Sequence, residues 1–169
     1  MVYAGNPDGY QDLDVLIEAM RQVPDVGLLM VSASSLAHWR NQGLKKARFV
    51  ETSDFEEVRS LLAAATIAAL PRTVCTGYPI KLLNNLGMGL PTVAAEGSAR
   101  PLPGVVSVPN HDAEQMARAI RFWVDRPEQC REVGQEAREY VVSHCSWAAR
   151  AVELEAVYCA VLQRTHGMG

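Results

Sequence analysis

Six short, almost uninterrupted apolar runs alternate with helix-like segments along most of this 169-residue chain. A strand with both faces covered by helices lacks the polar alternation of a half-exposed strand. Strands that alternate with helices favour a parallel sheet with right-handed crossovers. The sequence therefore predicts an α/β protein with a Rossmann-like, doubly wound parallel sheet of about six strands and helices on both faces. The predicted strands lie at residues 1–4, 26–31, 47–50, 66–70, 91–94 and 105–108.

Apolar residues at helical spacing predict the helices that cover this sheet. Two of them open on a capping box, Ser53 with Glu56 and Asp112 with Gln115. Three consecutive helices then close the chain, giving a helical C-terminus. No linker, repeat or low-complexity segment interrupts the pattern, so we expect a single domain over residues 1–169. The predicted helices span residues 13–22, 36–42, 55–64, 80–88, 111–124, 127–142 and 146–163.

The last predicted helix carries an apolar stripe, which we expect to pack in the core or against another domain. Exposure of part of the stripe would favour self-association, so a homodimer is expected. The chain also opens directly on a predicted strand, and we expect it to be the back half of a longer protein. The stripe consists of Trp147, Ala151, Leu154, Tyr158 and Val161.

Composition excludes several classes of protein. Apolar residues make up 49% of the chain and charged residues 21%, which is typical of a folded domain and not of a disordered one. The net charge of −3 and the lack of a basic tract argue against a nucleic-acid partner. The four cysteines form no CxxC pair, so we expect neither a metal site nor a disulfide framework, and a cytoplasmic location. No apolar run approaches the roughly 20 residues that span a bilayer.

Residues 71–94 hold the most informative local pattern. They read as a strand end, a loop with glycine and proline, a short helix, a glycine stop and a second buried strand. A helix that starts after a strand presents free backbone N–H groups and a partial positive charge to an anion. Lys81 adds a full positive charge in the first turn. The pattern predicts a phosphate site.

The same segment resembles the donor-sugar loop of GT-B glycosyltransferases of the family 4 type, the group 1 glycosyltransferases. That family has a Gly-aromatic-Pro-x-Lys-Leu run before a Gly-x-Pro-Val-Val strand, and residues 77–82 and 89–93 are similar to these two motifs. Residues 1–19 look like the family's opening strand, glycine and first helix. Residues 112–117 and 146–158 look like its closing helices, so the resemblance covers nearly the whole chain.

The resemblance implies the C-terminal donor-binding domain of a retaining, metal-independent hexosyltransferase. The substrate would be a nucleotide-diphosphate sugar, with no cofactor, and polysaccharide biosynthesis is the implied process. An acceptor-binding domain would precede residue 1, and the full enzyme would associate peripherally with a membrane. The catalytic residues stay unassigned, because no general base is visible. The donor-binding residues that the pattern and the resemblance together indicate are Gly5, Asn6, Gln11, Glu51, Thr76, Gly77, Tyr78, Pro79, Lys81, Leu82 and Asn84.

Several of these residues have an expected part. Gly5 lets the diphosphate approach the backbone. Gly77, Tyr78 and the backbone amides of residues 80–82 hold phosphate oxygens, while Lys81 neutralises the leaving nucleoside diphosphate. The remaining expectations concern side chains beside the phosphates: Asn84 hydrogen-bonds a ribose or sugar hydroxyl, and Glu51, with Thr52, either contacts the base or caps the next helix.

Several charged donor contacts of the family fall on neutral residues here. Its first-loop Arg falls on Asn6, its first-helix Lys on Gln11, and its two glutamates on Thr76 and Asn84. A hydrogen bond to a charged group is worth about 1.5–3 kcal/mol, so the loss of two cations would weaken donor binding by orders of magnitude unless Lys81 compensates. A second interpretation is therefore a catalytically silent, glycosyltransferase-like binding module. A third, a sugar-nucleotide epimerase, requires acidic and histidine groups that these loops lack.

Overall fold

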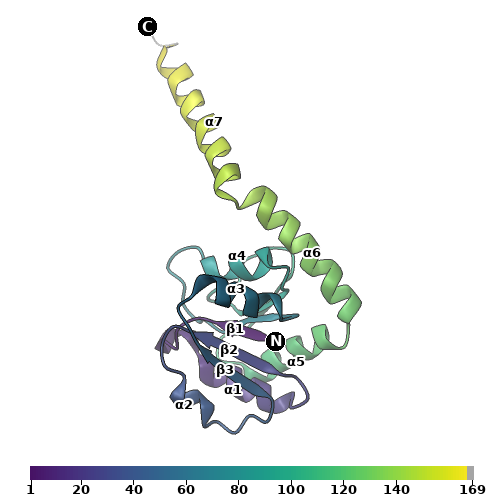
Figure 1. Ribbon diagram of the computed structural model, residues 1–169. Coiled ribbons are helices and arrows are strands. Elements are labelled where there is room, and N and C mark those ends of the chain that lie inside the picture. The colour runs from purple at the N-terminus through teal and green to yellow at the C-terminus, as the bar shows by residue number, and fades with distance from the viewer. Residues whose placement is uncertain (167–169) are drawn as a thin grey trace.

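The computed structural model describes the backbone of residues 1–166 and the side chains of residues 1–163 (Figure 1). All strand pairs are parallel, and they form one six-stranded sheet. This confirms the predicted doubly wound sheet. The strands are β1 (Val2–Ala4), β2 (Leu28–Ser32), β3 (Ala47–Glu51), β4 (Ala68–Leu70), β5 (Thr92–Ala95) and β6 (Val105–Val108). Their order across the sheet is β3-β2-β1-β4-β5-β6.

Helices cover both faces of the sheet. One face carries α1 and α5, which pack against each other, and the other face carries α3 and α4 (Figure 1). The last three helices follow one another with no strand between them, as the sequence predicts. The helices are α1 (Leu13–Gln22), α2 (Ala37–Arg40), α3 (Phe55–Ala63), α4 (Ile80–Gly87), α5 (Ala113–Val124), α6 (Pro127–His144) and α7 (Trp147–His166), with a 3₁₀ turn η1 (Gly9–Gln11) before α1.

The core has a large part under α1 and α5 and smaller parts on the opposite face. Tyr3, Met30 and Ile120 are fully buried in the first. On the opposite face, Leu82 and Leu86 of α4 pack with Ala137 of α6. Lys81 precedes Leu82 in the first turn of α4. Burial of the Leu82 face therefore fixes the direction in which the Lys81 side chain leaves the helix.

The ends of several elements differ from the sequence expectation. The strand expected at 66–70 starts at Ala68, because that residue is the first to pair with β1 and β5. The strand expected from residue 26 starts at Leu28, since the Val26 amide donates to the Val23 carbonyl in a turn. The helix expected at 36–42 is shorter in the structure, where α2 spans Ala37–Arg40.

One of the two expected capping boxes is wrong. The N-cap of α3 is Asp54 and not Ser53, and Asp54 Oδ1 accepts hydrogen bonds from the amides of Glu56 and Glu57 at 2.8 and 3.0 Å. The cap of α5 is Asp112, as expected, and its side chain accepts from the Gln115 amide at 2.8 Å. Periodicity cannot choose between two adjacent oxygen-bearing residues, whereas the backbone geometry can.

The apolar stripe of the last helix is exposed, so the expectation of core packing is wrong. Helix α7 leaves the body of the domain after α6 and points away from the sheet (Figure 1). Trp147 is 92% exposed and Tyr158 61% exposed, and Leu154 is also exposed. Packing against another domain or another copy of the chain stays a prediction.

Candidate functional site

The sheet has a topological switch point between β1 and β4. The chain runs from β1 outward through β2 to β3, and from β4 outward in the opposite direction through β5 to β6. The loops that follow β1 and β4 therefore diverge at the carboxyl edge of the sheet, which is the position where ligands of open α/β sheets bind. The space between these two loops is called the crevice. Residues 5–12 form one wall of this crevice and residues 71–79 the other. Ten of the eleven predicted site residues lie in these two loops or in α4.

Gly5 and Lys81 meet in this crevice. A Cβ atom added to Gly5 would lie 2.2 Å from Nζ of Lys81 and 3.0 Å from its Cε, so the ammonium occupies the space that only a glycine leaves open. Within the described residues Lys81 makes no hydrogen bond or ion pair, although it is only partly exposed. Burial, and then the charge of Arg72, lower its pKa, and Asp8 opposes the shift. The site thus holds a partly buried cation with no anion paired to it.

A second group of polar contacts ties the two walls together. Tyr10 donates its hydroxyl to Asp8 at 2.8 Å, and its carbonyl accepts from the Thr73 amide at 3.1 Å. The Arg72 guanidinium lies 4.6 Å from the centre of the Tyr10 ring, and its Nε donates to the Val74 carbonyl at 2.7 Å. Arg72 and Tyr10 were not among the site residues predicted from the sequence. The available signal was an arginine directly after a strand end, in a loop already assigned to the ligand.

Gln11 is fully buried in the wall formed by residues 5–12. Neither polar atom of its amide has a hydrogen-bond partner of normal geometry among the described residues. The hydrogen bond to Asp8 raises the pKa of Tyr10, and the nearby Gln11 amide opposes that shift. A buried amide without partners is rare in native structures, since it loses its hydrogen bonds to water without replacing them.

The start of α4 supplies backbone groups to the crevice. Pro79 is the N-cap and is buried, and its carbonyl accepts from the Leu82 amide at 2.8 Å. The Leu82 side chain is fully buried in the core. The free amides of the first turn are therefore those of Ile80 and Lys81, and Leu82 serves mainly to anchor the turn.

The other predicted residues of this loop lie on the far side of the helix start. Tyr78 and Asn84 line an apolar groove, while Thr76 is exposed. Arg100, from the loop after β5, donates to the Gly77 carbonyl at 3.1 Å and lies 5.9 Å from the Tyr78 ring. The structure thus brings Lys81 to Gly5 but does not bring the Tyr78 and Asn84 side chains to them.

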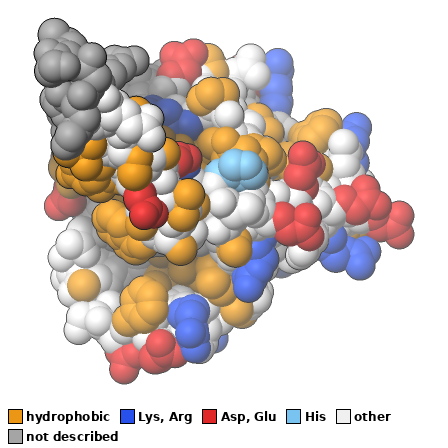
Figure 2. Space-filling model, turned by 90° about the horizontal axis from the view of Figure 1, so that it is seen from above, with side chains coloured by type: hydrophobic (Ala, Val, Ile, Leu, Met, Phe, Trp, Pro, Cys, Tyr) orange, Lys and Arg blue, Asp and Glu red, His pale blue; other side chains and the backbone are white. Residues whose placement is uncertain are grey.

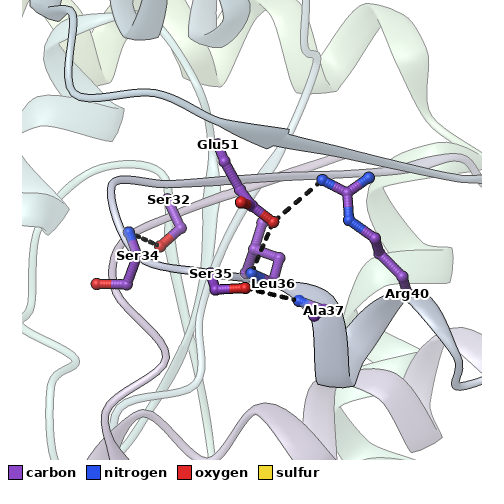
Figure 3. A network of polar contacts seen from close by, with 7 residues as sticks. All are labelled: Ser32, Ser34, Ser35, Leu36, Ala37, Arg40 and Glu51. Carbon is purple, nitrogen blue, oxygen red and sulfur yellow. Dashed lines mark hydrogen bonds and ion pairs between the residues drawn. The ribbon is translucent and has the colours of Figure 1, made fainter.

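Glu51 takes part in a separate network at the carboxyl ends of β2 and β3 (Figure 3). Its Oε1 accepts from the Leu36 amide at 2.9 Å and from Arg40 at 3.1 Å, and these bonds lower its pKa. Ser32 in the same network donates to Asn6 Oδ1 at 3.4 Å. One oxygen of Glu51 thus holds the start of α2, the helix that precedes β3, and the next helix, α3, is capped by Asp54 instead, so Glu51 does not cap the next helix as that alternative expected.

A groove of about 740 Å³ runs beside α4 on the side away from the sheet. It lies between α3, α4, α6 and the start of α7, and its walls are largely apolar, including Phe55, Ile80 and Trp147. Figure 2 shows hydrophobic side chains gathered on the face of the molecule seen from above.

Within the described part of the chain, no group of three or more His, Cys, Asp or Glu residues is placed to hold a metal ion. None of the described helices is both long and apolar enough to cross a membrane.

Residues 1–126 match the family described as Glycosyl transferases group 1. The match covers most of the chain, so the chain belongs to this family, as the resemblance in the sequence indicates. A curated relative is the MMP alpha-(1->4)-mannosyltransferase of Mycolicibacterium hassiacum, which is 28% identical over 117 residues, covering 64% of this chain and 28% of the relative.

Solved structures of glycosyltransferases share the fold. Sucrose-phosphate synthase from Thermosynechococcus elongatus superposes with a TM-score of 0.80 at 21% identity, over 96% of this chain and 46% of that one. Anabaena HepE in complex with UDP gives a TM-score of 0.73 at 14% identity, over 95% of this chain and 48% of HepE. The C-terminal domain of LpcC from Francisella tularensis gives 0.70 at 14% identity, over 86% of this chain and 85% of that domain. This chain therefore spans less than half the length of the mannosyltransferase, the synthase and HepE.

Proposed function

We propose that this chain is the donor-binding half of a retaining, metal-independent glycosyltransferase that uses a nucleotide-diphosphate sugar. The observation that carries the proposal is the Lys81 ammonium held against Gly5 at the switch point, with no anionic partner among the described residues. HepE, a structural neighbour, has been solved with UDP and with UDP-glucose, which supports this class of ligand.

In this proposal the crevice acts on the leaving group. Breaking the bond between the anomeric carbon and the diphosphate develops negative charge on the phosphate oxygens. Lys81 and the free amides at the start of α4 are fixed where they stabilise that charge, and they need no rearrangement during the reaction. A fixed cation next to the diphosphate supplies the role that a metal ion would otherwise have, and for this reason we propose a metal-independent reaction. No residue is assigned as nucleophile or general base.

The test is a titration of UDP and GDP into the wild-type chain and into Lys81→Met, which keeps the length of the side chain and removes its charge. Lys45→Met is the matched control, because Lys45 is exposed, makes no side-chain hydrogen bond or ion pair among the described residues and precedes β3 at the opposite edge of the sheet. We expect Lys81→Met to bind about 10- to 100-fold more weakly than Lys45→Met. Equal affinities in the two variants would contradict the proposal.

The alternative is a catalytically silent binding module, and the neutral residues Asn6, Gln11, Thr76 and Asn84 favour it. Gln11→Lys separates the two proposals. A donor-binding site should hold or gain affinity for UDP when this positive charge is introduced in the loop after β1. A silent module should bind neither UDP nor GDP at millimolar ligand in the wild type or in the variant.

The partners in the proposal follow from the size of the relatives. Because this chain spans less than half of several of them, we propose an acceptor-binding domain across the crevice and no sugar transfer by this chain alone. The acceptor must be held against the donor in reactive geometry, which the donor-side loops alone cannot do. A homodimer, through the exposed stripe of α7, a cytoplasmic location and peripheral membrane association of the full enzyme complete the proposal.

A further inference from the structure

We propose that Arg72 is the second cation of the diphosphate site, acting together with Lys81 at the mouth of the crevice. This inference rests on the proposed function, because it names a further residue of that same site. Apart from Lys81, the side chains expected to touch phosphate in the two loops carry no positive charge. One ammonium does not balance a diphosphate, so a site with a single cation would bind it weakly.

The Arg72 guanidinium is held in place through Nε, and its two terminal nitrogens point to no partner among the described residues. It lies over the Tyr10 ring at 4.6 Å, and Nε donates to the Val74 carbonyl at 2.7 Å. No hydrogen bond or ion pair of Nη1 or Nη2 occurs among the described residues. A guanidinium fixed at Nε, with both terminal nitrogens free, is ready to bind phosphate oxygens in a bidentate manner.

Arg72 and Lys81 are also electrostatic neighbours. The charge of Arg72 is, after burial, the next cause of the lowered Lys81 pKa. Asp8 opposes that shift, but it lies beyond ion-pair distance of both cations and is held by the Tyr10 hydroxyl at 2.8 Å. Two cations that repel each other destabilise the empty crevice, and a bound diphosphate would relieve this repulsion.

A purely structural role for Arg72 makes different predictions. The bond to Val74 and the contact with Tyr10 would stabilise the loop after β4 whatever ligand is bound. Loss of such a role should lower the melting temperature and weaken all nucleotides equally. Loss of a phosphate-binding charge should weaken ligands in proportion to their phosphate charge and leave the bare nucleoside unaffected.

The experiment compares Arg72→Gln and Arg72→Lys with the wild-type chain, using UDP, UMP and uridine as probes and measuring the melting temperature of each variant. Arg48→Gln is the control, since Arg48 is an exposed residue of β3 whose side chain makes no hydrogen bond or ion pair among the described residues. We expect Arg72→Gln to weaken UDP by about 10- to 100-fold, UMP by less and uridine not at all. Arg72→Lys should recover part of the loss, and the Lys81 pKa should rise in Arg72→Gln.

The outcomes separate the two proposals. If UDP binds the wild type and is lost in Lys81→Met but is unaffected in Arg72→Gln, the assignment of Arg72 is wrong and the proposed function stands. An equal loss for UDP, UMP and uridine together with a lower melting temperature also overturns the assignment, because it indicates a structural role. If neither UDP nor GDP binds the wild type, both proposals are wrong; if only GDP binds, GDP, GMP and guanosine replace the uridine series as probes.

Discussion

Replacing Gly5 with alanine separates ligand binding from folding at this site. The new Cβ would lie 2.2 Å from Nζ of Lys81 and 3.1 Å from the Tyr3 hydroxyl. The nearest atom is the far end of a flexible side chain, so the ammonium moves away and the backbone stays. The Gly5 φ lies outside the left-handed region, which in this chain contains other glycines (Gly43, Gly89 and Gly104). Alanine therefore fits the backbone of this position.

The magnitudes follow from these contacts. A hydrogen bond between a charged group and its partner contributes about 1.5–3 kcal/mol, so displacing Lys81 should weaken UDP binding by about 10- to 100-fold. The free energy of unfolding should change by no more than about 1 kcal/mol, because alanine lowers the entropy of the unfolded chain. That limit corresponds to about 2–4 °C in melting temperature for a domain of this size.

Isothermal titration with UDP and a thermal melt of the same samples measure both quantities. Gly9→Ala is the control, since Gly9 lies in the same loop and has nothing within 4 Å of an added Cβ. Unchanged UDP affinity in Gly5→Ala would refute the position assigned to the Lys81 ammonium. A fall of more than about 10 °C in melting temperature would refute the claim that the lysine yields to the new methyl group.

Three further predictions test the caps, the packing and the charge state. Asp54→Ala should lower the free energy of unfolding by about 1 kcal/mol in denaturant titrations, while Ser53→Ala should change it by less than about 0.5 kcal/mol. A larger loss in Ser53→Ala than in Asp54→Ala would indicate that Ser53, and not Asp54, caps α3. Gly134→Ala places a Cβ 2.3 Å from the Gly89 carbonyl oxygen, so it should destabilise the chain by about 1–3 kcal/mol or more, and a neutral result would contradict the close approach of α6. UDP affinity should fall as pH rises through the lowered pKa of Lys81, because a bound diphosphate requires the charged amine. The free energy of unfolding of the ligand-free chain should rise over the same pH range, since the unfolded chain then binds more protons than the folded chain. Lys81→Met should abolish both trends.

The fold was predictable because its signals are local and agree with one another. Strands buried on both faces need continuous apolar runs, and the alternation of strands and helices restricts the sheet to a parallel order. The environment of the last helix was not predictable. Helical spacing shows that Trp147, Leu154 and Tyr158 share a face, but it does not say what that face contacts.

The site was predictable only in part. Gly5 and Lys81 were assigned from separate motifs, and the order of the strands brings them together. Arg72 lies in the loop that carries the phosphate pattern, but it went unassigned because its contact with Tyr10, in the loop after β1, depends on the neighbouring position of β1 and β4. Asn84 lies in the helix that the sequence predicts, but its position around the axis of α4 decides whether its side chain faces the crevice or the apolar groove. Tyr78, in the loop before that helix, lines the same groove.

A crystal structure of this chain with UDP tests the central claim most directly. The proposal predicts that diphosphate oxygens lie within hydrogen-bond distance of Nζ of Lys81, between the Gly5 backbone and the first turn of α4. A diphosphate bound along the apolar groove, or at the opposite edge of the sheet, would contradict it. So would crystals grown at saturating UDP whose crevice contains no nucleotide.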